Sequence, residues 1–481
     1  MDTTTQTGLH ADLLVIGFGK GGSLVAAHMG RLGRRVVLVE ESAHMYGGTC
    51  PNIGCVPTKA LVHHAQGRRP GDPPQEWYEG AVGEVQALSA KFRAGNFASM
   101  NGADTVTVVT GHAVFAGPHT VDIDLSGELA DAGDVADMVV GDSLRVTADT
   151  ILINTGARPI VPDIPGLRDS KRTVISTELI QTTTLPERLA IVGAGYLGIE
   201  FASIYRRFGS RVTLFERTRR ILGHEDDDAV AAAIAILEDE GVEIITGAQI
   251  KEVRDGENEA TIVYEKDGDE HTVDADTILA ASGRAPVIQD LGLEAAGVRT
   301  TPRGAVEVDE HLRTSQPHIY ALGDVRGGPQ HTYLSLDDGR IVLDQLAGDG
   351  SRSTADRVAI PRTLFITPPL AAVGLTEKEA REAGHRVKIA MQAVADITAM
   401  PRSYIVEDTR GLMKFVIDAE SDQILGATLL SIDAQELVNT VALAIRHGVT
   451  AAELRDAVYT HPTSTEAFNG VLGVIVRSDG E

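Results

Sequence analysis

The sequence is poor in cysteine, in aromatic residues and in positive charge. Its 481 residues include two cysteines, Cys50 and Cys55, one tryptophan and 4% aromatic residues. A secreted disulfide framework in a chain of this size needs more cysteines, so the two thiols are either incidental or central to the chemistry. Acidic residues number 68 against 43 lysines and arginines, which gives a net charge of −25. That charge repels polyphosphate backbones and anionic membrane surfaces, so we expect neither nucleic acid nor a membrane as partner.

Long apolar runs are also missing. No uncharged stretch approaches the roughly 18 residues of a membrane span, and the first residues lack the basic and apolar segments of an export signal. We therefore expect a cytoplasmic protein. With 43% hydrophobic and 23% charged residues the chain has a globular composition. It is too long for one hydrophobic core, so several domains are expected.

Glycine, in contrast, is abundant, and two glycine-rich turns occur in the same context. Each follows a short apolar strand (Asp12–Ile16 and Leu189–Val192), precedes a helical segment (residues 23–33 and 199–208), and is followed by a second strand that ends in an acid. The turn glycines and acids are Gly17, Gly19, Gly22 and Glu40 in the first copy, and Gly193, Gly195, Gly198 and Glu216 in the second. In this motif the glycines permit a tight turn and close approach of a pyrophosphate, and the acid accepts hydrogen bonds from ribose hydroxyls. Two copies with the same spacing predict two dinucleotide-binding units.

The pattern between and after these units predicts the domain order. Strand-rich segments lead to two similar endings, TGARP and ASGRAP, where the chain passes from one unit to the next. Residues 263–279 are expected to form a hairpin about Lys266–Asp269. After residue 356 the pattern changes to an antiparallel sheet with flanking helices, one of them at 434–447. The expected fold is α/β, with two doubly wound Rossmann-like dinucleotide-binding domains and an α+β C-terminal domain.

The two cysteines lie in the segment GGTCPNIGCVPTKAL, which begins as a loop and is expected to become helical from Val56 to Ala65. Half of a zinc site is disfavoured because the chain has no other cysteine and the spacing is not a standard one. Two inert buried thiols are a further alternative. A disulfide across four intervening residues is sterically feasible, and a helix N-terminus stabilises a thiolate. The segment therefore favours a redox-active dithiol.

This segment resembles the active-site signature of the pyridine nucleotide-disulfide oxidoreductases, the flavoprotein family of glutathione reductase, dihydrolipoamide dehydrogenase and mercuric reductase. The resemblance runs from Asp12 to about Val471, because both glycine turns, TGARP, ASGRAP, YALGDV and HPTSTE occur in the family's order. It implies a glutathione-reductase-like homodimer. FAD would bind residues 1–157 and 285–355, NAD(P)H would bind residues 158–284, and residues 356–481 would form the dimerisation domain.

The resemblance also implies roles for individual residues. Cys55 would face the flavin and Cys50 would attack the substrate. His461 would be the acid/base supplied by the other subunit, with Glu466 as its orienting partner. The implied FAD contacts are Gly17, Gly19, Gly22, Glu40, Gly48, Thr49, Thr155, Gly156, Gly323 and Asp324. The implied NAD(P)H contacts are Gly193, Gly195, Tyr196, Gly198, Glu216, Arg217 and Gly283.

Two of the implied roles have ordinary alternatives. Lys59 would pair with Glu200 near the flavin, but a solvated helix lysine is the other interpretation. Tyr196 would cover the flavin until the nicotinamide displaces it, but it could simply be a packing tyrosine. His63 and His64 are interpreted as ordinary helix histidines, with metal binding as the alternative, and no metal site is predicted.

Other segments narrow the resemblance. The chain has no N-terminal CxxC and no C-terminal cysteine pair, which weakens similarity to mercuric reductases and large thioredoxin reductases. VIGFGKGG, MYGGTC, Thr58, HTYLSLDDGRIV and FITPPLAAVGLTEKEAREAG resemble the reactive-chlorine-resistance flavoproteins and bacterial hypothiocyanous acid reductases. This implies reduction of a small oxidant in oxidative-stress defence, either hypothiocyanous acid or Cu(II), with Cys50 attacking and Cys55 resolving the adduct. Dihydrolipoamide or other low-molecular-weight disulfide chemistry, and mercuric-reductase-like metal reduction, are the alternatives.

The choice of nicotinamide depends on Glu216, whose charge opposes a 2′-phosphate and favours NADH. Arg217, Arg219 and Arg220 follow at once and would partly offset it, so NADPH is expected to be tolerated. Two alternatives from another functional class are a lipoamide-oxidising subunit of a large complex and a flavin-bearing redox sensor. Neither a lipoyl domain nor a basic DNA-binding helix is visible, and this favours an enzyme.

Overall fold

The computed structural model describes residues 8–102 and 104–479, and the chain divides into two compact units. Unit 1 comprises Met1–Ala60, Ala81–Ile160 and Gly283–Asp356, and unit 2 comprises Leu61–Gly80, Val161–Ser282 and Arg357–Glu481. The boundaries fall near the expected domain limits, but the second nucleotide-binding segment and the C-terminal segment share one unit. Within the described part of the chain, no helix has the length and apolar character needed to cross a membrane.

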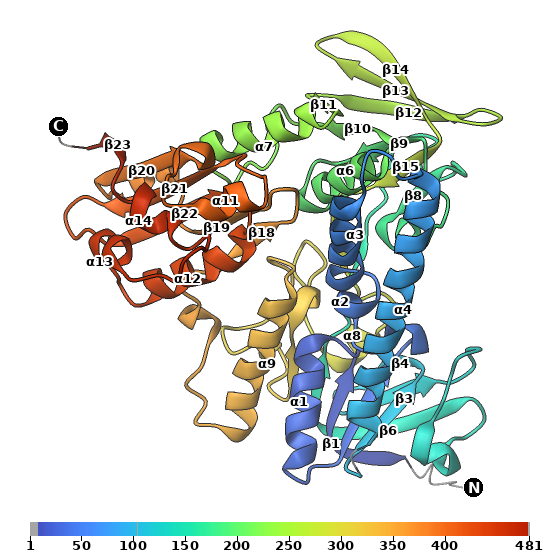
Figure 1. The fold of residues 1–481 in the computed structure, drawn as a ribbon. Helices are drawn as coiled ribbons and strands as arrows, with labels where there is room; N and C mark the ends of the chain where they lie inside the picture. Colours follow the sequence, from blue (N-terminus) through green and yellow to red (C-terminus); the bar gives the residue numbers. More distant parts are fainter. Residues whose placement is uncertain (1–7, 103, 480–481) are drawn as a thin grey trace, which may run out of the picture. The chain divides into compact units, whose positions relative to one another are not determined.

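The sheet of unit 1 is parallel at its centre and antiparallel at one edge. Its strands run in the order β3-β2-β1-β6-β5-β4, and β17 also pairs with β6. The strands are β1 (Leu9–Ile16), β2 (Val36–Glu40), β3 (Val106–Thr110), β4 (His112–Gly117), β5 (Thr120–Asp124), β6 (Ser143–Ile153) and β17 (Ile319–Ala321). The VVLV run of β2 is entirely buried, as expected for a parallel strand in a sheet covered on both faces. Figure 1 shows α1 (Lys20–Arg31) beside α9 (Thr332–Ala347), and these two helices pack together.

Smaller elements of unit 1 carry the motifs. The two similar chain endings pair with each other, because β7 (Ala157–Pro159) and β16 (Arg284–Pro286) form a two-stranded antiparallel sheet. The short helices are η1 (Ala43–Met45), α2 (Thr49–Asn52), η2 (Gly133–Met138), α8 (Leu293–Ala296), η3 (Gly323–Arg326) and η4 (Thr354–Asp356). Helices α3 (Cys55–Gly67) and α4 (Pro74–Asn101) each contribute residues to both units.

The nucleotide-binding part of unit 2 is a five-stranded parallel sheet in the order β11-β10-β9-β15-β8. Its strands are β8 (Thr173–Ile175), β9 (Arg188–Val192), β10 (Arg211–Glu216), β11 (Val242–Thr246) and β15 (Thr277–Ala280). The helices are α5 (Ser176–Leu179), α6 (Tyr196–Phe208) and α7 (Asp227–Asp239). A separate antiparallel sheet contains β12 (Gln249–Asp255), β13 (Ala260–Lys266) and β14 (Asp269–Ala275).

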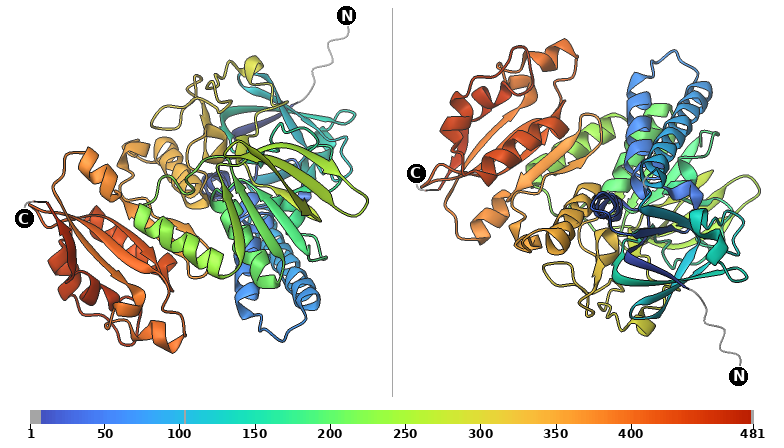
Figure 2. Two further views of the ribbon diagram at one scale, coloured as in Figure 1. Left: turned by 90° about the horizontal axis from the view of Figure 1, so that it is seen from above. Right: turned by 90° about the horizontal axis from the view of Figure 1, so that it is seen from below.

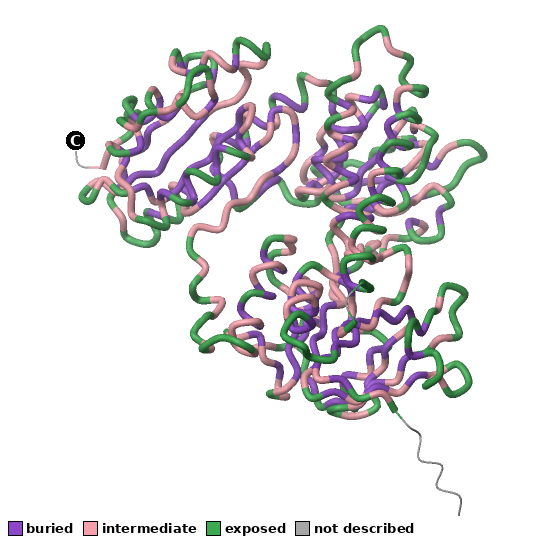
Figure 3. Tube along the Cα trace, turned by 60° about the horizontal axis from the view of Figure 1, so that its bottom comes forward, coloured by how far each residue is buried: buried purple, intermediate pink, exposed green. Residues whose placement is uncertain are grey.

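The C-terminal part of unit 2 is a six-stranded antiparallel sheet in the order β18-β19-β22-β21-β20-β23. Its strands are β18 (Arg362–Leu364), β19 (Leu370–Gly374), β20 (Val387–Ala393), β21 (Leu412–Asp418), β22 (Ile424–Leu430) and β23 (Ile475–Ser478). The helices are α10 (Glu377–Glu382), η5 (Val394–Asp396), α11 (Pro401–Ile405), α12 (Ala434–Arg446), α13 (Ala451–Asp456) and α14 (Ala467–Val471). The central strands are buried and the connecting loops exposed (Figure 3). Helix α7 lies beside this sheet in both views of Figure 2 and contacts β22.

The structure confirms the expected fold class and corrects several boundaries. The hairpin about residues 266–269 joins β13 to β14, and the helix expected at 434–447 is α12. The helices after the glycine turns begin earlier than expected, at Lys20 and Tyr196, because Gly19 and Gly195 are themselves the N-cap residues. Helices α4 and α7 were not predicted from the sequence.

Candidate active site

The two cysteines lie next to each other at the junction of α2 and α3. Cys50 is in α2 and is partly buried, and Cys55 is the first residue of α3 and is exposed. A hydrogen bond to Cys55 raises the pKa of the Cys50 thiol, and burial raises it further. Cys55 Sγ lies 3.4 Å from Thr332 Oγ1 in α9. Because N–H groups at a helix N-terminus favour negative charge, Cys50 is placed to carry the proton and Cys55 to accept its hydrogen bond.

The loop that carries Cys50 is held against the first glycine turn. A Cβ at Gly48 would lie 2.9 Å from Gly19 Cα, so the two backbones touch at that point. Asn52 donates from Nδ2 to the Gly48 carbonyl at 2.8 Å and accepts at Oδ1 from Arg93 Nε at 2.9 Å. The thiol pair is therefore fixed beside the first dinucleotide turn. Asn52 and Arg93 were not predicted as site residues, because Arg93 is distant in sequence and belongs to α4, a helix that was not predicted.

The first glycine turn is packed on the side chain of Asn154. A Cβ at Gly19 would lie 2.5 Å from Asn154 Oδ1, and this same oxygen accepts from the Gly22 amide at 2.9 Å. Asn154 donates from Nδ2 to the Leu322 carbonyl at 2.7 Å. The one sequence signal for Asn154 was a polar residue that closes an otherwise apolar strand. Its contacts hold the turn backbone in place for a pyrophosphate.

Glu40 closes the first turn from the end of β2. Its carboxylate accepts from the Phe18 amide at 2.9 Å and from the Ser42 amide at 3.3 Å. Burial raises the pKa of Glu40 to about 7, although these amide hydrogen bonds lower it. A carboxylate so poorly solvated is stabilised in its charged form by further hydroxyl donors. The two hydroxyls of the adenosine ribose of FAD fit this requirement.

Asp324, in η3, provides a second place for hydroxyl donors. Burial raises its pKa, and the positive charge of Arg284 opposes that shift. Burial lowers the pKa of Arg284 in turn. Among the described residues, nothing hydrogen-bonds to the Asp324 carboxylate, whereas the neighbouring Gly323 amide donates to Asp338 at 2.7 Å. A partly buried acid without a donor suits the polyhydroxyl ribityl chain of FAD.

The remaining residues expected near FAD are placed in the same unit. Gly156 has φ +73° and open space where a Cβ would be. The Thr155 hydroxyl donates to the Val287 carbonyl at 2.6 Å, so its proton serves the protein rather than a cofactor. Thr49 begins α2, with Gly48 as its N-cap residue. Together with Glu40 and Asp324, these positions fit FAD.

The second glycine turn repeats the first in unit 2. A Cβ at Gly198 would lie 2.0 Å from the Gly193 carbonyl oxygen, whereas a Cβ at Gly195 would meet nothing within 4 Å. Gly198 is therefore required for packing, and the face at Gly195 is left free for a pyrophosphate. Gly283, with φ +110°, also faces open space.

Glu216 occupies the same position in the second turn as Glu40 in the first. Its Oε2 accepts from the Ala194 amide at 3.1 Å, and its Oε1 accepts from the Thr218 amide at 2.9 Å. Of the arginines that follow, Arg219 pairs with Asp267 at 2.7 Å and Arg220 pairs with Asp227 at 2.8 Å. Arg217 is exposed, and no ion pair of its side chain is found within the described residues. A ribose fits this arrangement, and Arg217 is the arginine best placed to meet a 2′-phosphate.

His461 and Glu466 form a hydrogen-bonded pair in unit 2. His461 Nδ1 lies 2.8 Å from Glu466 Oε1, and Glu466 Oε2 accepts from the Thr463 amide at 2.7 Å. The Thr463 amide and then His461 lower the pKa of Glu466. The His461 side chain is 72% exposed. Because Nδ1 of His461 faces the Glu466 carboxylate, Nε2 of His461 is left to exchange a proton with a third group.

Lys59 and Glu200 fall in different units, so their pairing stays a prediction. Glu200, in α6, is buried, and its Oε1 accepts from the Phe365 amide at 2.9 Å. Tyr196, the first residue of α6, donates its hydroxyl hydrogen to Glu225 at 2.5 Å. Neither contact was predicted, because Phe365 and Glu225 lie in segments without a recognisable motif.

Within the part of the chain that the structure describes, no group of side chains spaced for a metal includes His63 or His64. The rings of His63 and His64 meet edge to face at 5.6 Å. Among the described residues, the group of three side chains spaced for a metal is His10, Asp12 and Asp149. Both Asp12 oxygens already accept from Arg35 at 2.8 Å.

Two dinucleotide turns with their acids, and a dithiol beside the first, define a flavin- and nicotinamide-dependent thiol oxidoreductase. The family model described as pyridine nucleotide-disulphide oxidoreductase matches residues 11–339, and the model of that family's dimerisation domain matches residues 360–471. The chain therefore belongs to the pyridine nucleotide-disulphide oxidoreductase family, as the resemblance predicted. It is an oxidoreductase that uses FAD and NAD(P)H, and it carries the family's dimerisation domain.

Individual relatives are similar over nearly the whole chain. The probable pyridine nucleotide-disulfide oxidoreductase RclA of Escherichia coli is 38% identical over 96% of this chain and 98% of its own length. Dihydrolipoyl dehydrogenase of Geobacillus stearothermophilus is 32% identical over 98% of both chains. A solved structure, the Cu(II) complex of the HOCl-induced flavoprotein disulfide reductase RclA from Escherichia coli, matches with a TM-score of 0.88. It covers 96% of this chain and 99% of its own, at 38% identity.

Proposed function

We propose that this chain is a homodimeric NAD(P)H-dependent reductase of a small oxidant, with hypothiocyanous acid as the substrate and Cu(II) as the second candidate. The observation that carries the proposal is the isolated dithiol. Cys50 and Cys55 are the only thiols of the chain and are hydrogen-bonded to each other, so no further thiol relay can pass electrons to a large substrate. The similarity to RclA, named as an HOCl-induced reductase, supports a role in defence against reactive chlorine or related oxidants.

The chemistry of the dithiol balances with hypothiocyanous acid. His461 takes the proton of Cys50, and the resulting thiolate attacks the substrate sulfur, so that an S–S bond forms and the S–O bond breaks. His461 returns the proton to the departing hydroxide, which leaves as water. Cys55 then attacks the Cys50 sulfur, thiocyanate leaves, and the Cys55 proton passes to solvent. The dithiol loses two electrons and the substrate gains them.

Regeneration requires two electrons from NAD(P)H. FAD, when bound, relays the hydride from nicotinamide to the disulfide. We assign Gly17, Gly19, Gly22, Glu40 and Asp324 to FAD, and Gly193, Gly195, Gly198, Glu216 and Gly283 to the nicotinamide nucleotide. Cys55, at the N-terminus of α3, is assigned to the flavin side of the dithiol. Lys59 and Glu200 are assigned as a charge pair near the flavin.

The dimer is proposed to complete the active site. His461 is highly exposed in the single chain, and Val458, three residues before it, is 99% exposed. Leu443 in α12 and Ile405 in α11 are also more than half exposed in the dimerisation domain. The match of residues 360–471 to the family's dimerisation domain supports a partner subunit that covers part of this surface. The partner subunit's His461 is therefore assigned to Cys50 of the first chain.

Substrate choice is tested by nicotinamide oxidation with hypothiocyanous acid, Cu(II), lipoamide, glutathione disulfide and Hg(II) in parallel. We expect rapid turnover with hypothiocyanous acid, slower turnover with Cu(II), and little with the two disulfides, lipoamide and glutathione disulfide. Cys50→Ser is the matched control, because it keeps the flavin site and removes the attacking sulfur. Negligible turnover with hypothiocyanous acid, together with rapid turnover of lipoamide, would replace the proposal with the dihydrolipoamide dehydrogenase-like alternative. Absence of steady turnover with every substrate would favour a redox sensor.

Glu216 is expected to set the preference for NADH. Its carboxylate is held by the Ala194 and Thr218 amides at the ribose position, so its charge meets a 2′-phosphate directly. Glu216→Ser should lower the ratio of kcat/KM for NADH to that for NADPH by roughly 10- to 100-fold, since one direct charge contact is removed. Glu243→Ser, on the neighbouring strand β11, is the control and should leave the ratio unchanged. An unchanged ratio in Glu216→Ser would remove this assignment.

A further inference from the structure

A chain of hydrogen bonds runs from the second glycine turn to the C-terminal sheet of unit 2. Tyr196 follows Gly195 directly and donates its hydroxyl hydrogen to Glu225 Oε1 at 2.5 Å. Arg362, the first residue of β18, grips the same carboxylate with two bonds, from Nε to Oε1 at 2.6 Å and from Nη2 to Oε2 at 2.8 Å. Glu225 thus joins a residue of the nucleotide turn to a strand 137 positions further along the chain.

The three side chains are largely withdrawn from water. The Glu225 side chain is 2% exposed and that of Arg362 is 24% exposed. Burial, and then the charge of Glu225, raise the pKa of Tyr196. Burial alone would lower the pKa of Arg362, but the bonds to Glu225 raise it. The phenol therefore donates to a buried carboxylate whose charge the guanidinium neutralises, and such charge-assisted bonds are strong.

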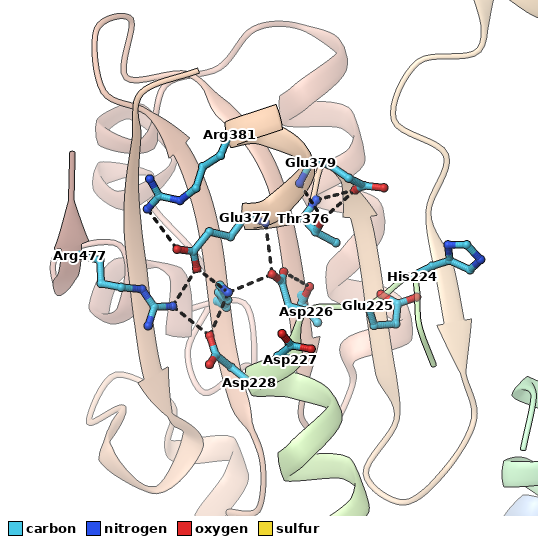
Figure 4. Close-up of polar contacts among 12 residues, drawn as sticks. His224, Glu225, Asp226, Asp227, Asp228, Thr376, Glu377, Glu379, Arg381 and Arg477 are labelled. Carbon is cyan, nitrogen blue, oxygen red and sulfur yellow. Dashed lines mark hydrogen bonds and ion pairs between the residues drawn. The ribbon is translucent and has the colours of Figure 1, made fainter. Parts of the chain in front are cut away.

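The segment that carries Glu225 is itself fixed. Asp226 and Asp228 both accept from Lys414 in β21, at 3.0 and 2.9 Å, and the Glu377 amide donates to Asp226 at 3.2 Å. In Figure 4 the carboxylates of Asp228 and Glu377 face Arg477, and Asp226 lies on the side of the cluster nearer Glu225. The residues that follow Glu225 are therefore bound to the C-terminal sheet through Lys414.

The space beside Gly195 is the reason why the position of the Tyr196 side chain matters. A Cβ at Gly195 would meet nothing within 4 Å, so there is room next to the base of the Tyr196 side chain. A tyrosine without an anchor samples other rotamers and can enter that space, whereas a tyrosine tied to Glu225 stays in one position. If the tyrosine side chain occupies the nucleotide's space for part of the time, the apparent affinity for the nucleotide falls in proportion to the fraction of time in which the space is free.

We propose that Glu225 and Arg362 are positioning residues that hold Tyr196 in one orientation and so keep the Gly193–Gly198 turn ready for the nicotinamide nucleotide. This inference rests on the proposed assignment of that turn to NAD(P)H. It adds two residues, both outside the glycine motif, that set the affinity for the nucleotide without touching the dithiol.

The test measures NAD⁺ binding to the FAD-loaded enzyme by calorimetry, together with KM and kcat for NADH with ferricyanide as acceptor, so that the natural oxidant does not matter. Glu225→Gln and Tyr196→Phe should each weaken binding and raise KM by about 3- to 10-fold, with kcat changed less than twofold. Tyr196→Phe removes this hydrogen bond and Glu225→Gln weakens it by removing the charge of the acceptor, so the double variant should bind no more weakly than Tyr196→Phe alone. Arg362→Lys should lie between wild type and Glu225→Gln.

Two controls separate the possible failures. Glu240→Gln removes a comparably buried carboxylate from its pairs with Arg207 and Arg410 and should leave NAD⁺ affinity unchanged. Gly195→Val fills the open face and should abolish NAD⁺ binding while FAD stays bound. Wild-type affinity in Gly195→Val would overturn the assignment of the turn. Loss of binding in Gly195→Val, with wild-type affinity in Glu225→Gln or additive effects in the double variant, would overturn the positioning role alone.

Discussion

A heterodimer that combines one Cys50→Ser chain with one His461→Gln chain is expected to keep about half of the wild-type turnover, although each variant homodimer is nearly inactive. If the partner subunit's His461 serves Cys50, the heterodimer contains one site with both substitutions and one site with neither. If His461 serves Cys50 of its own chain, each site carries one substitution and no intact site exists. The two arrangements therefore predict clearly different activities from the same molecule.

The reason for a large loss in the homodimers lies in the contacts of each residue. Cys50 is one of two thiols, so no other sulfur can replace it as the attacking atom. His461 is oriented through Nδ1 by Glu466 at 2.8 Å, which leaves Nε2 for proton transfer. Loss of a positioned acid/base typically slows turnover about 10²- to 10⁴-fold. Glutamine keeps the approximate size of the side chain but has no group that titrates near neutral pH.

The two chains carry different affinity tags, are co-expressed, and are purified on the two tags in sequence, so that only the heterodimer remains. Its turnover is then measured with hypothiocyanous acid or, if that substrate fails, with a disulfide substrate. Reduction of bound flavin by NADH should be normal in His461→Gln, because that step precedes the proton transfer at Cys50. A heterodimer as inactive as both homodimers would reject the shared site. Glu466→Gln paired with Cys50→Ser should behave in the same way, with a smaller loss in its own homodimer.

The features that sequence predicted are those encoded locally. The two glycine turns, their acids Glu40 and Glu216, and the position of Cys55 at a helix N-terminus depend on short segments whose chemistry is visible in order. In both turns the acid accepts from the amide between the first two glycines, Phe18 in one and Ala194 in the other. This repetition follows from the same strand-turn-helix-strand geometry, so the sequence pattern is sufficient to find it.

The features that sequence did not predict depend on contacts between distant segments. Asn154 supports the first turn from the far end of β6, and Arg362 reaches Glu225 from β18. No local pattern marks Arg362, and the local sign of Asn154 is only that a polar residue closes an apolar strand. Helix α4 was missed for another reason: Gly80, Gly83 and Gly95 lie inside it, and glycine costs about 1 kcal/mol per residue in a helix interior. Burial of apolar residues such as Tyr78, Val82 and Val85 outweighs that cost.

Replacement of Lys414 by methionine is expected to destabilise the protein by about 3–5 kcal/mol, because it leaves buried carboxylates without their cation. The Lys414 side chain is 2% exposed, and its Nζ lies 3.0 Å from Asp226, 2.9 Å from Asp228 and 2.9 Å from Glu377. Burial would lower the pKa of Lys414, but the charge of Asp226 and the bonds to the other two acids raise it. Arg477 also pairs with Asp228 and Glu377, at 3.0 and 2.8 Å, but is not hydrogen-bonded to Asp226.

The expected loss is measured as a fall of about 3–5 °C in the melting temperature followed by far-UV circular dichroism. Lys388→Met is the matched control, since Lys388 pairs with Asp422 on the same sheet with both side chains partly solvated. Such pairs contribute about 0–1 kcal/mol, so the control should melt near wild type. Asp226→Asn added to Lys414→Met should restore part of the loss, because it removes the most buried of the uncompensated charges.

The pH dependence separates a charge effect from a packing effect. Although burial raises the pKa values of Asp228 and Glu377, their bonds to Lys414 lower them on balance below the ordinary 3.8 and 4.5. A lowered folded-state pKa stabilises the protein above the unfolded-state pKa, and that stabilisation is lost as the pH falls through the folded-state value. The difference in melting temperature between wild type and Lys414→Met should therefore be largest near neutral pH and should shrink as the acids become protonated below about pH 4. A difference that stays constant over this range would mean that Lys414 acts through the volume of its side chain, and the ion cluster would then not be what holds α7 to the C-terminal sheet.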